Sequence, residues 1–134
     1  MAQINFSIFK ALIIEDSEFL RRTIRKYMIE CGFQEVREAG NGQEGLEQLR
    51  HGPDIIVCDI EMEPINGFEF LKLLREQEGE VSKTPVLFLT GSAQKEDVHK
   101  AIELGVNGYV VKPVTPENLK KKLTDVLNRA MSSP

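Results

Sequence analysis

Short apolar runs alternate along the chain with stretches in which apolar residues recur at helical spacing. Runs of this length are typical of β-strands, and they lie at residues 10–14, 33–39, 55–58, 84–90 and 109–111. After the first run, apolar side chains return every three or four residues from Leu20 to Cys31, and after the last they do so from Leu119 to Leu127. We therefore predict five strands, each followed by a helix.

The character of the runs predicts how the strands are arranged. Residues 55–58 (IIVC) are continuously apolar, which indicates a strand buried on both faces of a parallel sheet, whereas residues 33–39 are more polar and fit an edge. Alternating strands and helices favour right-handed crossovers with helices on both faces. We expect an α/β, doubly wound, five-stranded parallel sheet, (βα)5, in a single domain over residues 1–134 with its core at about 10–131.

Composition and charge narrow the functional classes. The chain of 134 residues is 41% hydrophobic and 28% charged, which is typical of a soluble globular protein, and its net charge of −4 argues against nucleic-acid binding. No basic leader or long apolar segment predicts export or contact with a membrane. Cys31 and Cys58 lack metal-ligand spacing, so we predict two reduced cysteines in a cytoplasmic protein.

Polar residues stand where the predicted strands end. Glu15 and Asp16 follow the first strand, and Asp59, Thr90 and Lys112 close the third, fourth and fifth strands. Ligands of open α/β sheets bind outside the carboxyl ends of the strands, so we expect these groups to converge on one cleft. Taken alone, Asp59 fits the start of an ordinary turn equally well.

The expected cluster has a specific chemistry. Three carboxylates in contact repel one another unless a cation joins them, and Mg²⁺ is the usual hard dication with oxygen ligands. A lysine ammonium is suited to a phosphoryl oxygen or to one of the acids. A carboxylate can attack phosphorus while a metal ion and a lysine neutralise the transferring oxygens, so the pattern predicts an acyl phosphate on an aspartate.

The order and spacing of these residues resemble a known family. Glu15-Asp16, Asp59, Thr90-Gly91 and Lys112-Pro113 occur with Gly67 eight positions after Asp59 and Tyr109 three before Lys112. This pattern closely resembles the receiver domain of two-component response regulators, of the stand-alone chemotaxis-regulator type. The resemblance implies a flavodoxin-like fold with strand order 2-1-3-4-5.

The resemblance also implies a role for each residue. Asp59 would accept a phosphoryl group from a histidine kinase or a histidine phosphotransfer protein. Thr90 and Lys112 would hold the phosphoryl oxygens, Tyr109 would be the switch aromatic, and the Lys112–Pro113 peptide would be cis. Mg²⁺ would be bound by Glu15, Asp16, Asp59 and the backbone carbonyl of Glu61. An aromatic residue at a strand end can also serve packing alone, which is the alternative role for Tyr109.

The function implied is that of a single-domain response regulator with a downstream protein target. Such a chain is a signalling protein, not an enzyme, although it catalyses its own phosphorylation and dephosphorylation. We expect a monomer, with dimerisation on phosphorylation as an alternative. The readout surface would comprise the fourth helix, fifth strand and fifth helix, with exposed residues such as Glu96, His99, Glu103 and Lys121.

Two other functions stay open: a phosphorelay intermediate that passes the group to a histidine phosphotransfer protein, and an unphosphorylated interaction domain.

The sequence departs from the usual receiver pattern in three places. Glu15 stands where many members have aspartate, which lengthens one arm by a methylene. The usual proline four residues after the acceptor is replaced by Glu63, with Pro64 one position later. Glu61 adds a further negative side chain at the mouth of the expected site, with an effect that the sequence does not decide.

Overall fold

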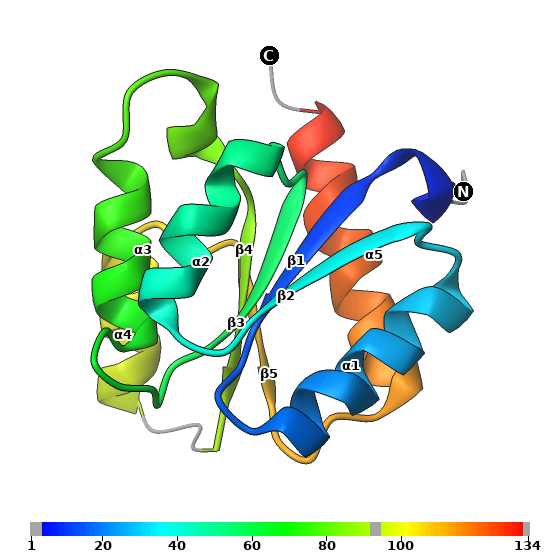
Figure 1. Cartoon of the computed structure of the whole chain (residues 1–134), viewed down its shortest axis with the longest axis horizontal. Helices are drawn as coiled ribbons and strands as arrows, with labels where there is room; N and C mark the ends of the chain where they lie inside the picture. The colour runs from blue at the N-terminus through cyan, green and yellow to red at the C-terminus, as the bar shows by residue number, and fades with distance from the viewer. Residues whose placement is uncertain (1–3, 92–94, 133–134) are drawn as a thin grey trace.

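The computed structural model describes residues 4–91 and 95–132, with side chains except those of 95–97. Its centre is one parallel sheet of five strands in the order β2-β1-β3-β4-β5 (Figure 1). The strands are β1 (Lys10–Ile14), β2 (Glu35–Ala39), β3 (Ile55–Asp59), β4 (Val86–Thr90) and β5 (Gly108–Val111). This architecture confirms the predicted fold class and strand order.

In the described residues, five α-helices connect and follow the strands, together with three short 3-10 helices that the pattern did not predict. The α-helices are α1 (Glu18–Cys31), α2 (Gly42–Gln48), α3 (Gly67–Arg75), α4 (Lys95–Glu103) and α5 (Pro116–Ser132). The 3-10 helices are η1 (Phe6–Ile8), η2 (Leu49–His51) and η3 (Glu80–Lys83). No helix in the described part of the chain is both long and apolar enough to span a bilayer.

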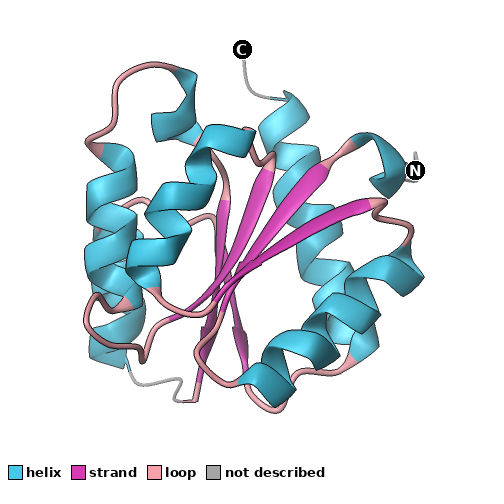
Figure 2. Cartoon of the chain, in the orientation of Figure 1, coloured by secondary structure: helices cyan, strands magenta, loops and turns pink. Residues whose placement is uncertain are grey.

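The helices form a layer on each face of the sheet. Helices α1 and α5 cover one face, and α2, α3 and α4 cover the other (Figures 1 and 2). Each layer encloses its own core: Ile24 and Leu123 pack with Val57 on the first face, and Phe70 packs with Cys58 on the second. Since β3 and β4 are buried along their whole length, only their ends offer polar groups to a ligand.

The edge position predicted for the second strand is confirmed, with one correction. β2 pairs only with β1 within the described sheet, and Val36 and Ala39 enter opposite cores, as the alternation predicted. A period of two extended back from Ala39 predicts Phe33 on the side of Ala39, but Phe33 packs with Val36 instead. The reason is that β2 begins at Glu35, so the period of two does not extend back to Phe33.

Arg75 joins four segments at the opposite end of the sheet from the predicted site. Its guanidinium donates to the carbonyls of Ser82 (3.0 Å), Thr84 (2.8 Å) and Gly105 (2.8 Å), and to Asn107 Oδ1 (3.0 Å). The last residue of α3 is thereby tied to η3, to the start of β4 and to the turn after α4. These bonds satisfy carbonyls that the ends of the elements leave without partners.

Candidate functional site

The topology brings four strand ends together. β1, β3, β4 and β5 are consecutive neighbours in the sheet, and all run in the same direction. Glu15 follows β1, Asp59 and Thr90 are the last residues of β3 and β4, and Lys112 follows β5. The polar residues singled out in the sequence therefore lie at one edge of the sheet.

Three carboxylates meet at this edge. Oxygen atoms of Glu15, Asp16 and Asp59 all lie within 4.8 Å of one another. Glu15 and Asp59 are almost completely buried, with 1% and 2% of their surfaces exposed, while Asp16 is exposed. The cluster is thus an acidic pocket that is open toward solvent on the side of Asp16.

Lys112 is the cation nearest to the buried acids among the described ion pairs. Its Nζ lies 3.1 Å from Asp59 Oδ1 and 3.4 Å from Glu15 Oε1. These distances suit charge-assisted contacts, and beyond Lys112 neither buried oxygen has a hydrogen-bond partner among the described residues. Two buried carboxylate oxygens that share a single ammonium are suitable ligands for a hard dication once both acids are ionised.

Burial dominates the electrostatics of Glu15. Burial raises the pKa of the Glu15 carboxyl from 4.5 to about 7, and a hydrogen bond with Asp16 and the charge of Asp59 act in the same direction. The Ser17 N–H and Lys112 oppose this rise in pKa only in part. One ammonium does not balance three carboxylates, so the pocket without metal favours a proton on Glu15 near neutral pH.

The pKa of the Lys112 ammonium is raised by the neighbouring acids. Burial alone lowers the pKa of its ammonium, but the attraction of Asp59 and Glu15 outweighs burial and raises the pKa above the ordinary 10.5. Lys112 is therefore positively charged throughout the physiological range. Its charge partly stabilises Asp59 and would face any further negative charge brought to that residue.

The backbone around the pocket holds the acids in place. The Ser17 side chain caps α1 by accepting from the Leu20 N–H (3.2 Å), while the Ser17 N–H donates to Glu15 Oε2 (3.1 Å). At the other side, Gly67 opens α3 and donates its N–H to the Ile60 carbonyl (2.8 Å). A Cβ on Gly67 would lie 2.6 Å from the Asp59 carbonyl oxygen, so only glycine permits this close approach.

Thr90 and Tyr109 share one face of the sheet. Thr90 pairs with Val111 and Phe88 pairs with Tyr109, and paired residues of parallel strands point the same way. Tyr109 is half-buried against the core under α3 and α4, and Lys122 Nζ lies 5.9 Å from its ring centroid. The Lys112–Pro113 peptide is cis, as the resemblance implied, and the Lys112 N–H donates to the Thr90 carbonyl (2.7 Å).

A groove of about 610 Å³ opens beside the pocket and contains both Asp16 and Thr90. Glu61 and Glu63 line it with exposed side chains, and the Glu63–Pro64 peptide that shapes the loop is also cis. A larger hollow of about 680 Å³ lies at the amino ends of the strands and contains none of the predicted site residues. The groove at the carboxyl ends is therefore the one relevant to the acids.

Two supports of the site were not anticipated from the sequence. Ser17 N–H holds the Glu15 carboxylate, and Arg21 donates to the Glu15 backbone carbonyl (2.9 Å). The helix cap at Ser17 was detectable as a serine just before a helical pattern. Arg21 gave no comparable signal, because an arginine on an amphipathic helix is usually solvated.

The fold and the acidic pocket define a doubly wound α/β protein with a carboxylate site at the ends of its strands. The family described as response regulator receiver domain matches residues 11–124, and the chain belongs to this family. Its acidic pocket is consistent with the phosphoaspartate site of such a protein and is typical of a receiver metal site.

Individual relatives agree with this assignment. The chain is 37% identical over 121 residues to chemotaxis protein CheY-3 of Vibrio cholerae. These aligned residues make up 90% of this chain and 92% of the relative. It is 36% identical over 120 residues to a CheY homologue of Campylobacter jejuni, covering 88% and 92%. The crystallised Vibrio cholerae CheY4 is similar with a TM-score of 0.82 at 34% identity, covering 88% of this chain and 98% of that one. The chain is thus a CheY-like response regulator, and this class implies a kinase partner and a downstream target.

Proposed function

We propose that Asp59 accepts a phosphoryl group from a phosphohistidine on a kinase or phosphotransfer protein. The observation that carries this proposal is the buried acidic pocket, in which Asp59 lies between two further acids and 3.1 Å from the Lys112 ammonium. Asp59 is the last residue of the central strand β3, and of the two buried acids it lies nearer to Lys112, at 3.1 Å against 3.4 Å for Glu15. An oxygen of Asp59 attacks phosphorus, the P–O bond forms and the P–N bond to the imidazole breaks.

The other residues of the pocket stabilise charge during this transfer. Lys112 would offer a positive charge to the transferring oxygens, and the hydroxyl of Thr90, at the end of the neighbouring strand, would donate to one of them. Glu15, Asp16, Asp59 and the Glu61 carbonyl would hold Mg²⁺, which supplies further positive charge to the phosphoryl oxygens. These groups belong to the chain itself, so the chain catalyses its own phosphorylation.

The proposed setting is a cytoplasmic signalling pathway. Cys31 and Cys58 are free, which suits a reducing compartment. The named relatives are chemotaxis proteins, and we propose the same kind of pathway for this chain. In this pathway the phosphoryl group on Asp59 changes a surface that a partner protein recognises.

Thr90 and Tyr109 provide the route for that change. Both side chains lie on the face covered by α4, so movement of Thr90 toward a phosphoryl group leaves space toward which Tyr109 can turn. The readout surface is formed by α4, β5 and α5, where His99, Glu103 and Lys121 are exposed and Ile102 is 62% exposed. The side chain of Glu96, predicted on the same surface, lies outside the described residues. Coupling through two side-chain states is typically worth about 1–3 kcal/mol.

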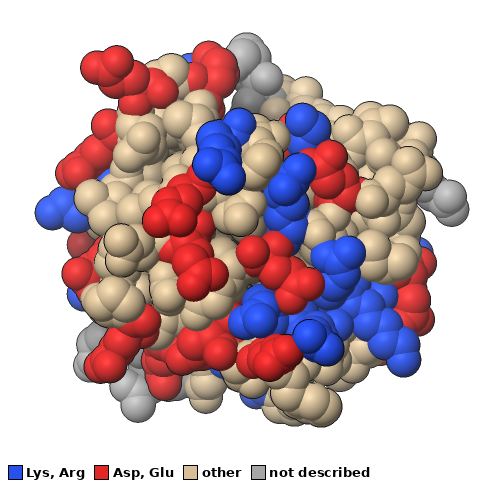
Figure 3. Space-filling view, in the orientation of Figure 1, with Lys and Arg blue, Asp and Glu red and all other residues tan. Residues whose placement is uncertain are grey.

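A second function, transfer onward to a histidine phosphotransfer protein, is favoured by the surface of α1. Phe19 is 82% exposed, three residues after Asp16, and basic side chains gather over α1 in an otherwise acidic chain (Figure 3). An exposed phenylalanine so near to Asp16 in the sequence is suited to docking a partner during transfer. Transfer of the phosphoryl label from the phosphorylated chain to an added histidine phosphotransfer domain would identify this function.

Labelling with acetyl phosphate tests the acceptor. With Mg²⁺ present, the wild type should gain one acid-stable, base-labile phosphoryl group by intact-mass analysis, and Asp59→Asn should gain none. Asp54→Asn is the matched control, because Asp54 lies just before the same strand and its Oδ2 accepts from the Lys10 N–H (2.7 Å), away from the three clustered acids. Undiminished labelling of Asp59→Asn would place the acceptor elsewhere.

The switch is tested by partner affinity. Binding of a purified downstream target should strengthen about 5- to 150-fold when the wild type is phosphorylated, and much less for Thr90→Ala. Equal affinity of the two forms of the wild type would contradict the proposed switch.

A further inference from the structure

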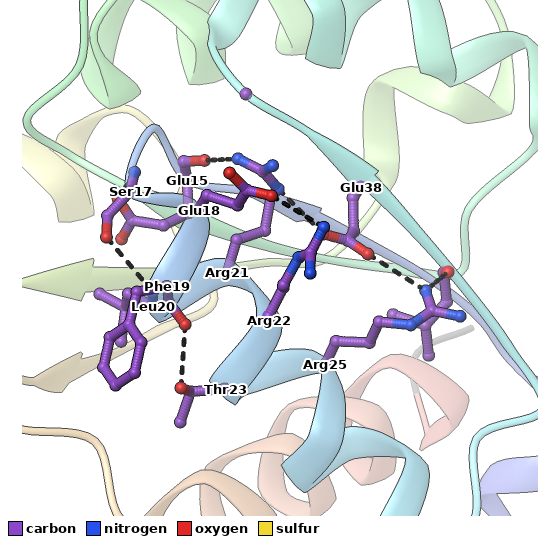
Figure 4. A network of polar contacts seen from close by, with 12 residues as sticks. Glu15, Ser17, Glu18, Phe19, Leu20, Arg21, Arg22, Thr23, Arg25 and Glu38 are labelled. Carbon is purple, nitrogen blue, oxygen red and sulfur yellow. Dashed lines mark hydrogen bonds and ion pairs between the residues drawn. The ribbon is translucent and has the colours of Figure 1, made fainter.

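Arg21 links the acidic pocket to the edge strand of the sheet. Its Nη1 donates to the Glu15 carbonyl (2.9 Å) and its Nε donates to Glu38 Oε1 (2.9 Å) on β2, as Figure 4 shows. Its side chain is only 18% exposed. The guanidinium is therefore a bridge between the end of β1, helix α1 and strand β2.

The carbonyl that Arg21 contacts belongs to the peptide between the two acids. A peptide unit is planar, so fixing its oxygen fixes the plane from which Glu15 and Asp16 both project. The preceding peptide is fixed as well, because the Glu15 N–H donates to the Ala39 carbonyl (3.1 Å). Asp16 is exposed, so the position of its carboxylate depends on this backbone and on its hydrogen bond with Glu15.

From this geometry we infer that Arg21 is a positioning residue for Mg²⁺ binding, which holds the Glu15–Asp16 peptide so that both carboxylates face Asp59. The inference rests on the metal site proposed above and adds a residue that touches neither the metal nor the phosphoryl group. Groups that orient metal ligands typically change metal affinity about 10- to 100-fold when they are removed.

The charge and the geometry of Arg21 have opposite effects on a cation. A guanidinium behind the acids repels Mg²⁺, so if charge were its only effect, Arg21→Gln would bind Mg²⁺ more tightly. If Arg21 orients the acids, the same variant binds Mg²⁺ more weakly. Arg21→Lys keeps the charge but lacks the planar fork that reaches two acceptors at once, so it also binds more weakly.

Arg25 provides a matched control on the same helix. Its Nη1 lies 3.5 Å from Glu38 Oε2 and donates to the Val36 carbonyl, with no contact to Glu15 among the described bonds (Figure 4). Arg25→Gln therefore weakens the link between α1 and β2 without releasing the peptide of the acid pair. Any general loss of stability should appear in both Arg21→Gln and Arg25→Gln, whereas the loss of Mg²⁺ affinity should appear only in the former.

The experiment is calorimetric titration of Mg²⁺ into each variant, with melting curves in EDTA to confirm folding. We expect Arg21→Gln and Arg21→Lys to bind Mg²⁺ about 10- to 100-fold more weakly than the wild type, and Arg25→Gln to bind like the wild type. Glu38→Gln should weaken Mg²⁺ binding in the wild type but not in the Arg21→Gln background, because Glu38 acts through Arg21.

The outcomes separate this inference from the proposed metal site. No Mg²⁺ binding by the folded wild type would overturn the metal site and this inference together. A wild type that binds Mg²⁺ beside an Arg21→Gln variant of equal or higher affinity would overturn the inference alone, as would full rescue by Arg21→Lys.

Discussion

Replacing Glu15 by glutamine should make the metal-free protein more stable at alkaline pH. The Glu15 carboxyl is 1% exposed and its pKa rises from 4.5 to about 7. Between these two pH values the folded state holds a proton that the unfolded state has already lost. Stability therefore falls as pH rises through this window, and it is lowest above the folded-state pKa.

The magnitude follows from the size of the shift. One pKa unit corresponds to about 1.36 kcal/mol, so the ionised Glu15 carboxylate opposes folding by roughly 3 kcal/mol when the pH is well above 7. Glutamine has nearly the same shape and no charge to bury. The variant should match the wild type below pH 4.5 and exceed its free energy of unfolding by up to roughly 3 kcal/mol well above pH 7.

Urea unfolding followed by circular dichroism measures this difference, first in EDTA at a series of pH values. Addition of millimolar Mg²⁺ should then narrow the difference at alkaline pH, because the wild type offers an ionised ligand and the variant does not. Glu18→Gln is the control: Glu18 is 64% exposed and pairs with Arg22 in solvent, so its curve should follow the wild type. Parallel pH profiles of the wild type and Glu15→Gln in EDTA would refute the electrostatic account of the pocket.

Three further predictions test the surroundings of Glu15. In the absence of metal, Lys112→Gln should lower the free energy of unfolding at neutral pH by about 1–3 kcal/mol, a value between those of exposed and buried ion pairs. An unchanged urea midpoint would contradict this prediction. Gly67→Ala should destabilise the folded protein by about 1–3 kcal/mol and weaken Mg²⁺ binding by displacing Asp59. Gly40→Ala is the control and should have neither effect, because its added Cβ would lie no closer than 3.6 Å to any neighbouring atom. Mg²⁺ binding near pH 7 should release about half a proton from Glu15, seen as a binding enthalpy that depends on the buffer, and this release should vanish at alkaline pH.

The order of strands and helices was predictable because both periodicities are strong in this chain. The start of α3 was less clear from Phe70, Leu71 and Leu74, which mark only its inner face. A signal was nevertheless present: Asn66 and Glu69 form a capping box, with the Asn66 side chain accepting from the Glu69 N–H (2.9 Å). The 3-10 helices were missed because a single tight turn leaves no periodic pattern.

The convergence of Glu15, Asp59 and Lys112 was predictable from strand ends alone, since parallel strands end at one edge of the sheet. Their distances and burial were not predictable, because these depend on side-chain packing between segments far apart in the sequence. Arg21 illustrates the difference: Glu38 and Glu15 are its partners only after β1 and β2 have paired. The catalytic, metal and switch roles of the site residues stay predictions that the experiments above test.

The hydrogen bonds of Arg75 restrain the C-terminal end of α4. Its guanidinium holds the Gly105 carbonyl just beyond the C-terminus of the helix, and Asn107 beside it is fixed by the same group and by the Val86 N–H (2.8 Å). Any tilt of α4 that preserves these bonds has its pivot near Gly105. The nine residues of α4 form a lever of about 13 Å, so a tilt of about 10° displaces its far end by about 2 Å and its near end hardly at all. The end that would travel is the one that follows Thr90 in the chain, so rotation of a single rigid helix would enlarge a small change at β4 into a displacement that a partner could detect.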